Sequence, residues 1–166
     1  MPVIYVLNSL PIERFDPDEI RAAVTESNFH TLCDQYGLEP ALIEPALKYL
    51  AVQAAPDPDV SFFSLRYAPE TSAPIIVNRW EDVDRLSALL HTLGSAAPSA
   101  AYQQIKQTRE VLLIEISREQ SHDLGLLFAY ELARWAAFKG KGVVRGLDGL
   151  WYRLNSHKAF IPIKQY

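Results

Sequence analysis

The sequence predicts an α+β fold, with a single mixed, mainly antiparallel sheet of about five to seven strands and helices packed mostly on one face. Two apolar runs, 3–7 and 111–116, are typical of buried strands, and the second is apolar enough for burial on both faces. Residues 124–138 have a broad apolar stripe, which predicts a helix lying across the sheet. Residues 142–154 contain Asp148-Gly149 between two β-rich runs, which predicts a hairpin.

Length and composition favour one domain spanning residues 1–166. The chain has 166 residues, of which 49% are hydrophobic, and this is enough to bury a real core. No repeat or low-complexity segment divides it, and the proline–acid break at 56–59 is too short for an interdomain linker. The first ten residues lack a basic segment, and no apolar run approaches the length of a membrane span. A single cysteine, Cys33, excludes an internal disulfide and fits a reducing, cytoplasmic location.

The first helices are predicted from their start signals. Asp16 can cap a helix that begins at Pro17, and Glu19 can close a capping box with it. A second short helix is expected over 27–36, ended by Gly37.

A third helix is expected to begin at Glu39-Pro40, with helical spacing of apolar residues as far as Ala51. Pro45 predicts a separate or kinked first turn. Residues 60–67 and 74–78 are then read as a hairpin joined by the loop 68–73, followed by a helix over 80–93 and a loop over 95–101.

The remaining junctions are also marked by sequence. Ser117 and Gln120 can form a capping box at the start of the next helix, and Gly125 within that helix suggests a close backbone approach. The segment 139–142, Lys-Gly-Lys-Gly, is expected to end the helix. Residues 158–163 can add an edge strand, limited by Pro162.

Charge is distributed unevenly along the chain. Residues 13–44 contain eight acids and two arginines, whereas residues 134–166 contain seven basic residues and one acid. Such asymmetry favours charge-steered contact with a partner. The alternative is that both regions are solvated surfaces that keep the protein in solution. The acids predicted to bind the partner are Glu13, Asp16, Asp18, Glu19, Glu26 and Asp34.

Sequence signals for catalysis are weak. There is no nucleophile elbow and no phosphate-binding loop, and the four histidines lack metal-ligand spacing, so we expect no metal and no cofactor. Aromatic residues interleave with the basic ones near the C-terminus, but a pI near 5.5 argues against nucleic-acid binding. Cys33 is expected to be a packed thiol rather than a reactive one.

An enzymatic alternative rests on Glu115 and Glu131, which interrupt apolar runs and could act with His122 in acid–base catalysis. The competing interpretation places Glu115 at a polar rim. It places Glu131 on the solvent side of its helix, paired with Arg134 three residues on. A third possibility is an oligomeric scaffold, a homo-oligomer without a ligand.

One stretch resembles known proteins. Residues 131–152 read Glu-Leu-Ala-Arg-Trp-Ala-Ala-Phe-Lys-Gly-Lys-Gly-Val-Val-Arg-Gly-Leu-Asp-Gly-Leu-Trp-Tyr. Together with the preceding strand, they make a segment, 110–154, that is similar to the closing helix and hairpin of small uncharacterised bacterial proteins, including toxin-immunity proteins. The resemblance implies a non-enzymatic protein-binding domain that neutralises a cognate bacterial toxin by direct binding, and the acidic helical surface would suit a basic toxin domain. It carries over no catalytic residue.

Overall fold

The centre of the sheet is a pair of antiparallel strands, β1 (Val3–Asn8) and β5 (Glu110–Glu115), which run from Val3 opposite Glu115 to Asn8 opposite Glu110. The computed structural model describes residues 2–27, 29–58, 61–68 and 73–164. Alternate side chains of each strand enter two different cores, one on each side of the sheet. This confirms that the apolar run beginning at Val111 is buried on both faces.

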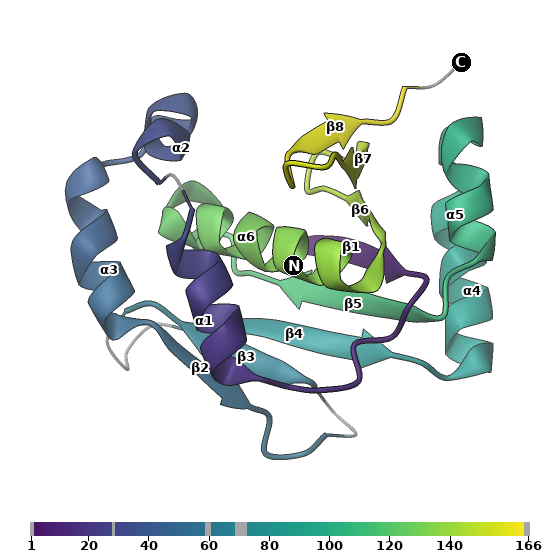
Figure 1. The fold of residues 1–166 in the computed structure, drawn as a ribbon, viewed down its shortest axis with the longest axis horizontal. Helices are drawn as coiled ribbons and strands as arrows, with labels where there is room; N and C mark the ends of the chain where they lie inside the picture. The colour runs from purple at the N-terminus through teal and green to yellow at the C-terminus, as the bar shows by residue number, and fades with distance from the viewer. Residues whose placement is uncertain (1, 28, 59–60, 69–72, 165–166) are drawn as a thin grey trace.

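The described strands form one open sheet in the order β2-β3-β4-β5-β1-β6-β7-β8 (Figure 1). Every described pair is antiparallel, so the sheet is not mixed, and its eight strands exceed the five to seven predicted. The other strands are β2 (Ala51–Ala54), β3 (Phe63–Arg66), β4 (Ile75–Trp80), β6 (Val143–Arg145), β7 (Trp151–Leu154) and β8 (Phe160–Pro162).

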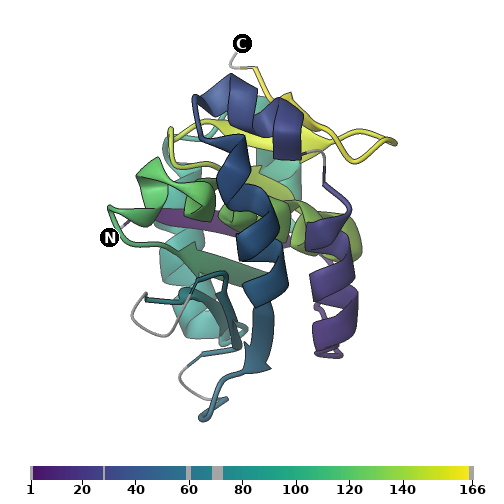
Figure 2. The same cartoon turned by 90° about the vertical axis from the view of Figure 1, so that its left-hand side faces the viewer.

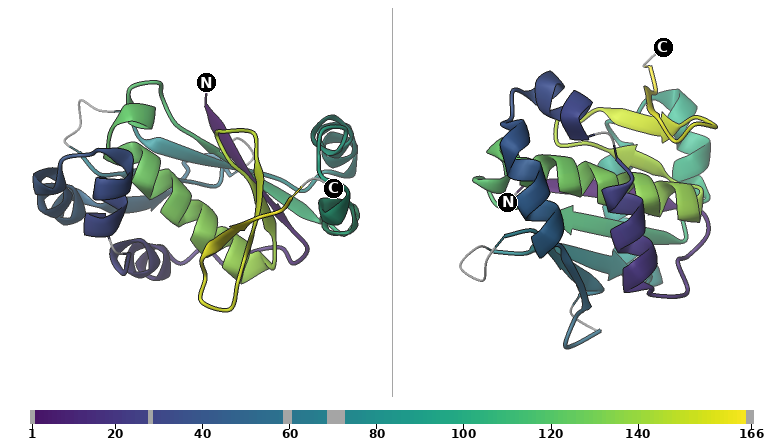
Figure 3. Two further views of the ribbon diagram at one scale, coloured as in Figure 1. Left: turned by 90° about the horizontal axis from the view of Figure 1, so that it is seen from above. Right: turned by 60° about the vertical axis from the view of Figure 1, so that its left-hand side comes forward.

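In the described part of the chain, helices cover both faces of the sheet, more of them on one side than on the other (Figure 1; Figure 3, left). The larger core lies under α6 (Leu124–Gly140), α1 (Pro17–Thr25), α2 (Phe29–Tyr36) and α3 (Ile43–Tyr49), and we call this side the α6 face. The smaller core lies under α4 (Val83–Gly94) and α5 (Tyr102–Lys106), on the α4–α5 face. The prediction that helices pack mostly on one face therefore agrees with this arrangement.

The extra strand, β2, occupies a position where a helix was expected to continue. A 3₁₀ turn at Pro40–Leu42 precedes α3, which confirms a separate first turn, but the chain leaves the helix at Leu50. Ala51 then pairs with Arg66 of β3, and Ala54 pairs with Phe63. Pairing with β3 therefore outweighs the preference for a helix that the spacing of the apolar residues indicates in this segment.

Several boundaries in the middle of the chain differ from the prediction. Trp80 ends β4, and Asp82 caps α4 by accepting hydrogen bonds from the backbone N–H groups of Asp84 and Arg85. Part of the predicted loop over 95–101 is a 3₁₀ turn at Ser99–Ala101, which leads into α5. Of the predicted β3–β4 hairpin, residues 60 and 69–72 lie outside the described part of the chain.

The start of α6 also differs from the prediction. Ser117 and Gln120 exchange the two hydrogen bonds of a capping box, as predicted. However, the box leads into a 3₁₀ turn at Gln120–His122, and Asp123 caps α6 itself by accepting a hydrogen bond from the N–H of Gly125. A Cβ added to Gly125 would lie 2.5 Å from the Tyr67 hydroxyl, which confirms the predicted close approach.

Candidate functional site

Two cavities lie next to each other along the outer side of α6, and both are lined by Glu131 and Arg134. The first, of about 710 Å³, is bounded by α1 and by the turn before β8, and we call it the α1 cavity. The second, of about 590 Å³, is bounded by α2, by the β6–β7 turn and by β8, and we call it the tyrosine cavity. Figure 3 shows the segment containing β7 and β8 crossing above α6.

Glu131 and Arg134 form an ion pair between the two cavities. Glu131 is only 3% exposed, so the prediction that it lies on the solvent side of α6 was wrong, although its pairing with Arg134 is confirmed. Burial raises the pKa of the Glu131 carboxyl, while the Arg134 guanidinium and the Ser27 hydroxyl act in the opposite direction. Glu131 is the buried member of the pair, since its side chain is 3% exposed and that of Arg134 is 28% exposed. Figure 2 shows α1 lying against the helix that carries both residues, α6.

The raised pKa of Glu131 predicts a pH dependence of stability. A carboxyl whose pKa is higher in the folded state stabilises the fold while it is protonated, and this contribution is lost as the pH rises through the folded-state pKa. The free energy of unfolding of the wild type, relative to Glu131→Gln, is therefore expected to increase when the pH falls from 7 to 5. Urea unfolding of both proteins at both pH values measures this difference in the free energy of unfolding. If the difference stayed constant, or became smaller at pH 5, the pKa of Glu131 would not be raised in the folded protein.

The tyrosine cavity has aromatic walls from α2, α6, β7 and β8. The Phe160 ring meets the rings of Tyr130 and Tyr152 edge-on, each with centroids 6.0 Å apart, and Tyr36 also lines the cavity. The Tyr130 hydroxyl accepts a hydrogen bond from the Leu147 N–H at 3.0 Å. These contacts hold three of the four rings in fixed positions.

An acid completes the tyrosine cavity. The Tyr152 hydroxyl donates a hydrogen bond to the Asp148 carboxylate, and burial together with this bond raises the pKa of Tyr152. The charged residues that line the cavity are Glu131, Arg134 and Asp148, so its net charge is −1 when all three are ionised.

The six acids predicted to bind a partner have different surroundings. Asp16 accepts hydrogen bonds from the N–H groups of Asp18 and Glu19 and thereby caps α1, as predicted. Glu19 does not close a capping box but pairs with Lys139 of α6. The other four side chains are exposed and form no ion pair within the described residues: Glu13, Asp18, Glu26 and Asp34.

The three residues of the enzymatic alternative are not brought together. Glu115 lies on the α4–α5 face, because it alternates with Ile114 of the α6-face core, and its carboxylate accepts a hydrogen bond from Asn78 at 3.1 Å. Glu131 lies on the opposite face of the sheet, and His122 is exposed in the turn before α6. None of the cavities described above joins them.

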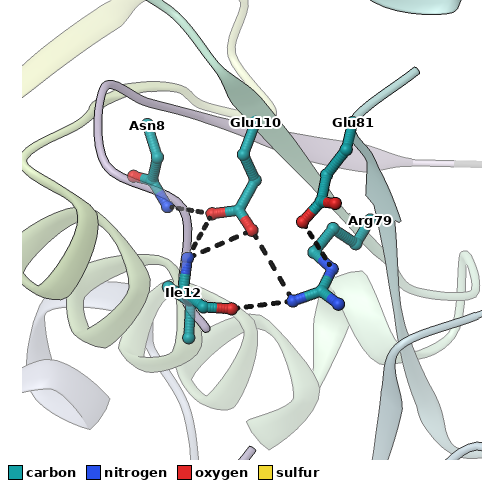
Figure 4. Close-up of polar contacts among 5 residues, drawn as sticks. All are labelled: Asn8, Ile12, Arg79, Glu81 and Glu110. Atoms are coloured by element: carbon teal, nitrogen blue, oxygen red, sulfur yellow. Dashed lines mark hydrogen bonds and ion pairs between the residues drawn. The ribbon is translucent and has the colours of Figure 1, made fainter. Parts of the chain in front are cut away.

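A buried polar network that the sequence did not reveal lies at the far end of α6 (Figure 4). Glu110 is fully buried and accepts hydrogen bonds from the Asn8 side-chain amide at 3.0 Å and from the Ile12 N–H at 3.1 Å. Arg79 donates to the Ile12 carbonyl at 2.7 Å and lies 3.8 Å from the Glu110 carboxylate. Burial raises the pKa of Glu110, against the effect of these partners.

The network explains the two glycines near the end of α6. Between the two glycines, it is Lys141 that has left-handed backbone geometry (φ 49°), so neither glycine is needed for that conformation. A Cβ on Gly140 would lie 2.6 Å from Asn8 Oδ1, and a Cβ on Gly142 would lie 2.6 Å from the Leu7 carbonyl oxygen. The glycines therefore make room for the Asn8 side chain and the adjacent backbone of β1.

Cys33 is fully buried in the α6-face core, and burial raises the pKa of its thiol. Among the described residues, no three His, Cys, Asp or Glu side chains gather as metal ligands would. No helix in the described part of the chain combines the length and apolar character needed to cross a bilayer.

Comparison with protein-family models, with curated proteins and with solved structures found no match to this chain.

Proposed function

We propose that this protein binds another protein through the acidic surface of α1 and α2, as an immunity protein that neutralises a basic toxin domain would. The observation that carries the proposal is the set of exposed carboxylates on the two helices and on the segment before them. Asp18 lies on α1 and Asp34 on α2, while Glu13 precedes α1 and Glu26 directly follows it. Unpaired surface carboxylates of one sign attract a basic partner and speed its association.

The placement of the basic residues supports this orientation. Lys139, His157 and Lys158 line the side of the α1 cavity opposite α1, and Lys139 already pairs with Glu19. Glu26 also lines this cavity, whereas Asp18 and Asp34 do not, so these two carboxylates are the ones placed away from the basic residues of the cavity. A basic partner would meet Asp18 and Asp34 first.

The proposal predicts a specific effect of charge reversal. Asp18→Lys is expected to weaken binding of a basic partner about tenfold at low salt, with a smaller effect at high salt, because exposed charges are screened. The natural partner to test is the product of the gene adjacent to this one, by calorimetry at two salt concentrations. In cells, the wild-type protein should restore growth when that product is co-expressed.

A matched control is available on the other face. Asp84 is also an exposed acid in the first turn of a helix, and its N–H bonds to a capping aspartate as the N–H of Asp18 does. Asp84→Lys should therefore match any effect of Asp18→Lys on helix stability without affecting partner binding. If the two variants weaken binding equally, or if the adjacent product neither binds nor harms cells, the proposal is wrong.

A further inference from the structure

The geometry points to the tyrosine cavity as a site for one cationic side chain, an arginine or lysine presented by a protein partner. This inference rests on the proposed function, because it names the group of a basic partner that enters the fold. The main support for the inference is that four aromatic rings surround a cavity of about 590 Å³ whose lining has a net negative charge. The rings are those of Tyr36, Tyr130, Tyr152 and Phe160.

The aromatic walls supply the attraction for a cation. The faces of aromatic rings carry negative electrostatic potential, and several rings around one cavity can surround an ammonium or guanidinium group. The edge-on packing of Phe160 against Tyr130 and Tyr152 fixes three of these rings. Tyr36, which is 45% exposed at the end of α2, provides the fourth ring at the solvent side.

The charged groups around the cavity favour a cation over an anion. Arg134 lies over the Phe160 ring at 6.0 Å from its centroid, which places a cation of the chain itself at this aromatic cluster. Glu131 neutralises Arg134, and Asp148 then leaves one negative charge in the lining. Asp34 adds a further exposed carboxylate on the same helix as Tyr36.

The position of the cavity agrees with entry from the acidic surface. Leu32, Gln35 and Tyr36 belong to α2, whose exposed residues include Asp34, so a partner held by the acids of α1 and α2 would lie beside the cavity. The volume falls within the range of ordinary ligand pockets, which is ample for one long side chain. An uncharged aliphatic side chain is the competing occupant, since leucines also line the cavity.

The test uses the full-length protein and three small probes: N-acetyl-arginine methylamide, N-acetyl-lysine methylamide and the uncharged N-acetyl-norleucine methylamide. Aromatic NMR signals of Tyr130, Tyr152 and Phe160 are followed during titration to millimolar concentration. The two cationic probes are expected to shift these signals saturably, and the norleucine probe is expected to bind at least threefold more weakly. Tyr36→Ala should weaken the cationic probes about two- to fivefold, whereas Tyr36→Phe should keep their affinity.

The control is Tyr102→Ala on α5, because Tyr102 is also 45% exposed but lies outside the tyrosine cavity. The affinity of the Tyr102→Ala variant for the probes should equal that of the wild type. If the norleucine probe bound as tightly as the cationic probes, or if no probe shifted the signals saturably, the proposal of a cation site would be wrong.

The probe experiment is independent of the partner experiment. If no probe binds but Asp18→Lys still weakens partner binding, only the cation site is wrong. If the cationic probes bind but no basic partner is found, only the proposed function is wrong.

Discussion

Glu110→Ala is expected to lower the free energy of unfolding by about 3–5 kcal/mol, because two buried donors lose their acceptor at a cost of about 1–3 kcal/mol each. The truncation removes the acceptor for the Asn8 amide and the Ile12 N–H, both of which lie in buried surroundings. It also removes the carboxylate beside Arg79. Buried donors without an acceptor carry the full cost of their desolvation, which explains the size of the effect.

Denaturant unfolding followed by circular dichroism measures this change. Glu115→Ala is the matched control, because Glu115 ends the same strand, is half-buried and accepts one hydrogen bond from Asn78. That substitution is expected to cost about 1 kcal/mol. If the two variants were equally stable, Glu110 would not hold the β1–α1 segment in place.

Gly140→Ala is expected to destabilise the protein by about 3 kcal/mol, at the upper end of the usual cost of overpacking a buried site. The new Cβ would overlap the side-chain amide of Asn8, which cannot move freely because it is fully buried and bonded to Glu110. Gly94→Ala, near the end of α4, provides the control because its Cβ would meet only Ile105, at 3.9 Å. That change should be neutral or stabilising by up to about 1 kcal/mol.

A double-mutant cycle identifies Asn8 as the cause. When Asn8 is already replaced by Ala, the extra cost of Gly140→Ala should fall by at least half, because the amide that the Cβ would overlap is gone. Gly142→Ala should not be rescued in this way, since its Cβ also meets the Leu7 carbonyl oxygen of the backbone. An unchanged cost of Gly140→Ala in the Asn8→Ala background would contradict the packing explanation.

Local patterns predicted most of the secondary structure. The run beginning at Val111, the Asp16 cap and the Asp148-Gly149 hairpin all rest on neighbouring residues, and each is present in the structure. β2 was missed because the helical spacing around Leu50 is real, while its pairing with β3 depends on residues farther along the chain.

The polar network could not be predicted because it depends on contacts distant in sequence. Asn8 and Glu110 stand 102 positions apart, and each lies at the end of an apolar run, where a polar side chain ordinarily faces water. Similarly, the neighbouring residues predict only that Gly140 and Gly142 end the helix. Glycine is required at both positions because a Cβ there would overlap atoms of β1. The signal that the sequence offered was the pair of glycines on either side of Lys141.

For the candidate site, composition identified the acids of residues 13–44, and four of the six chosen carboxylates are exposed and free of ion pairs within the described chain. Their role in binding a partner stays a prediction. The tyrosine cavity was not predicted, because Tyr36 and Phe160 meet the rings of α6 and β7 only after the C-terminal strands cross that helix.

Hydrogen–deuterium exchange of the complex with the adjacent gene's product would locate the binding surface on this fold. Slower amide exchange on binding is expected in α1 and α2, with no change in α4 and α5. Slower exchange confined to α4 and α5, with α1 and α2 unaffected, would contradict the proposed binding surface.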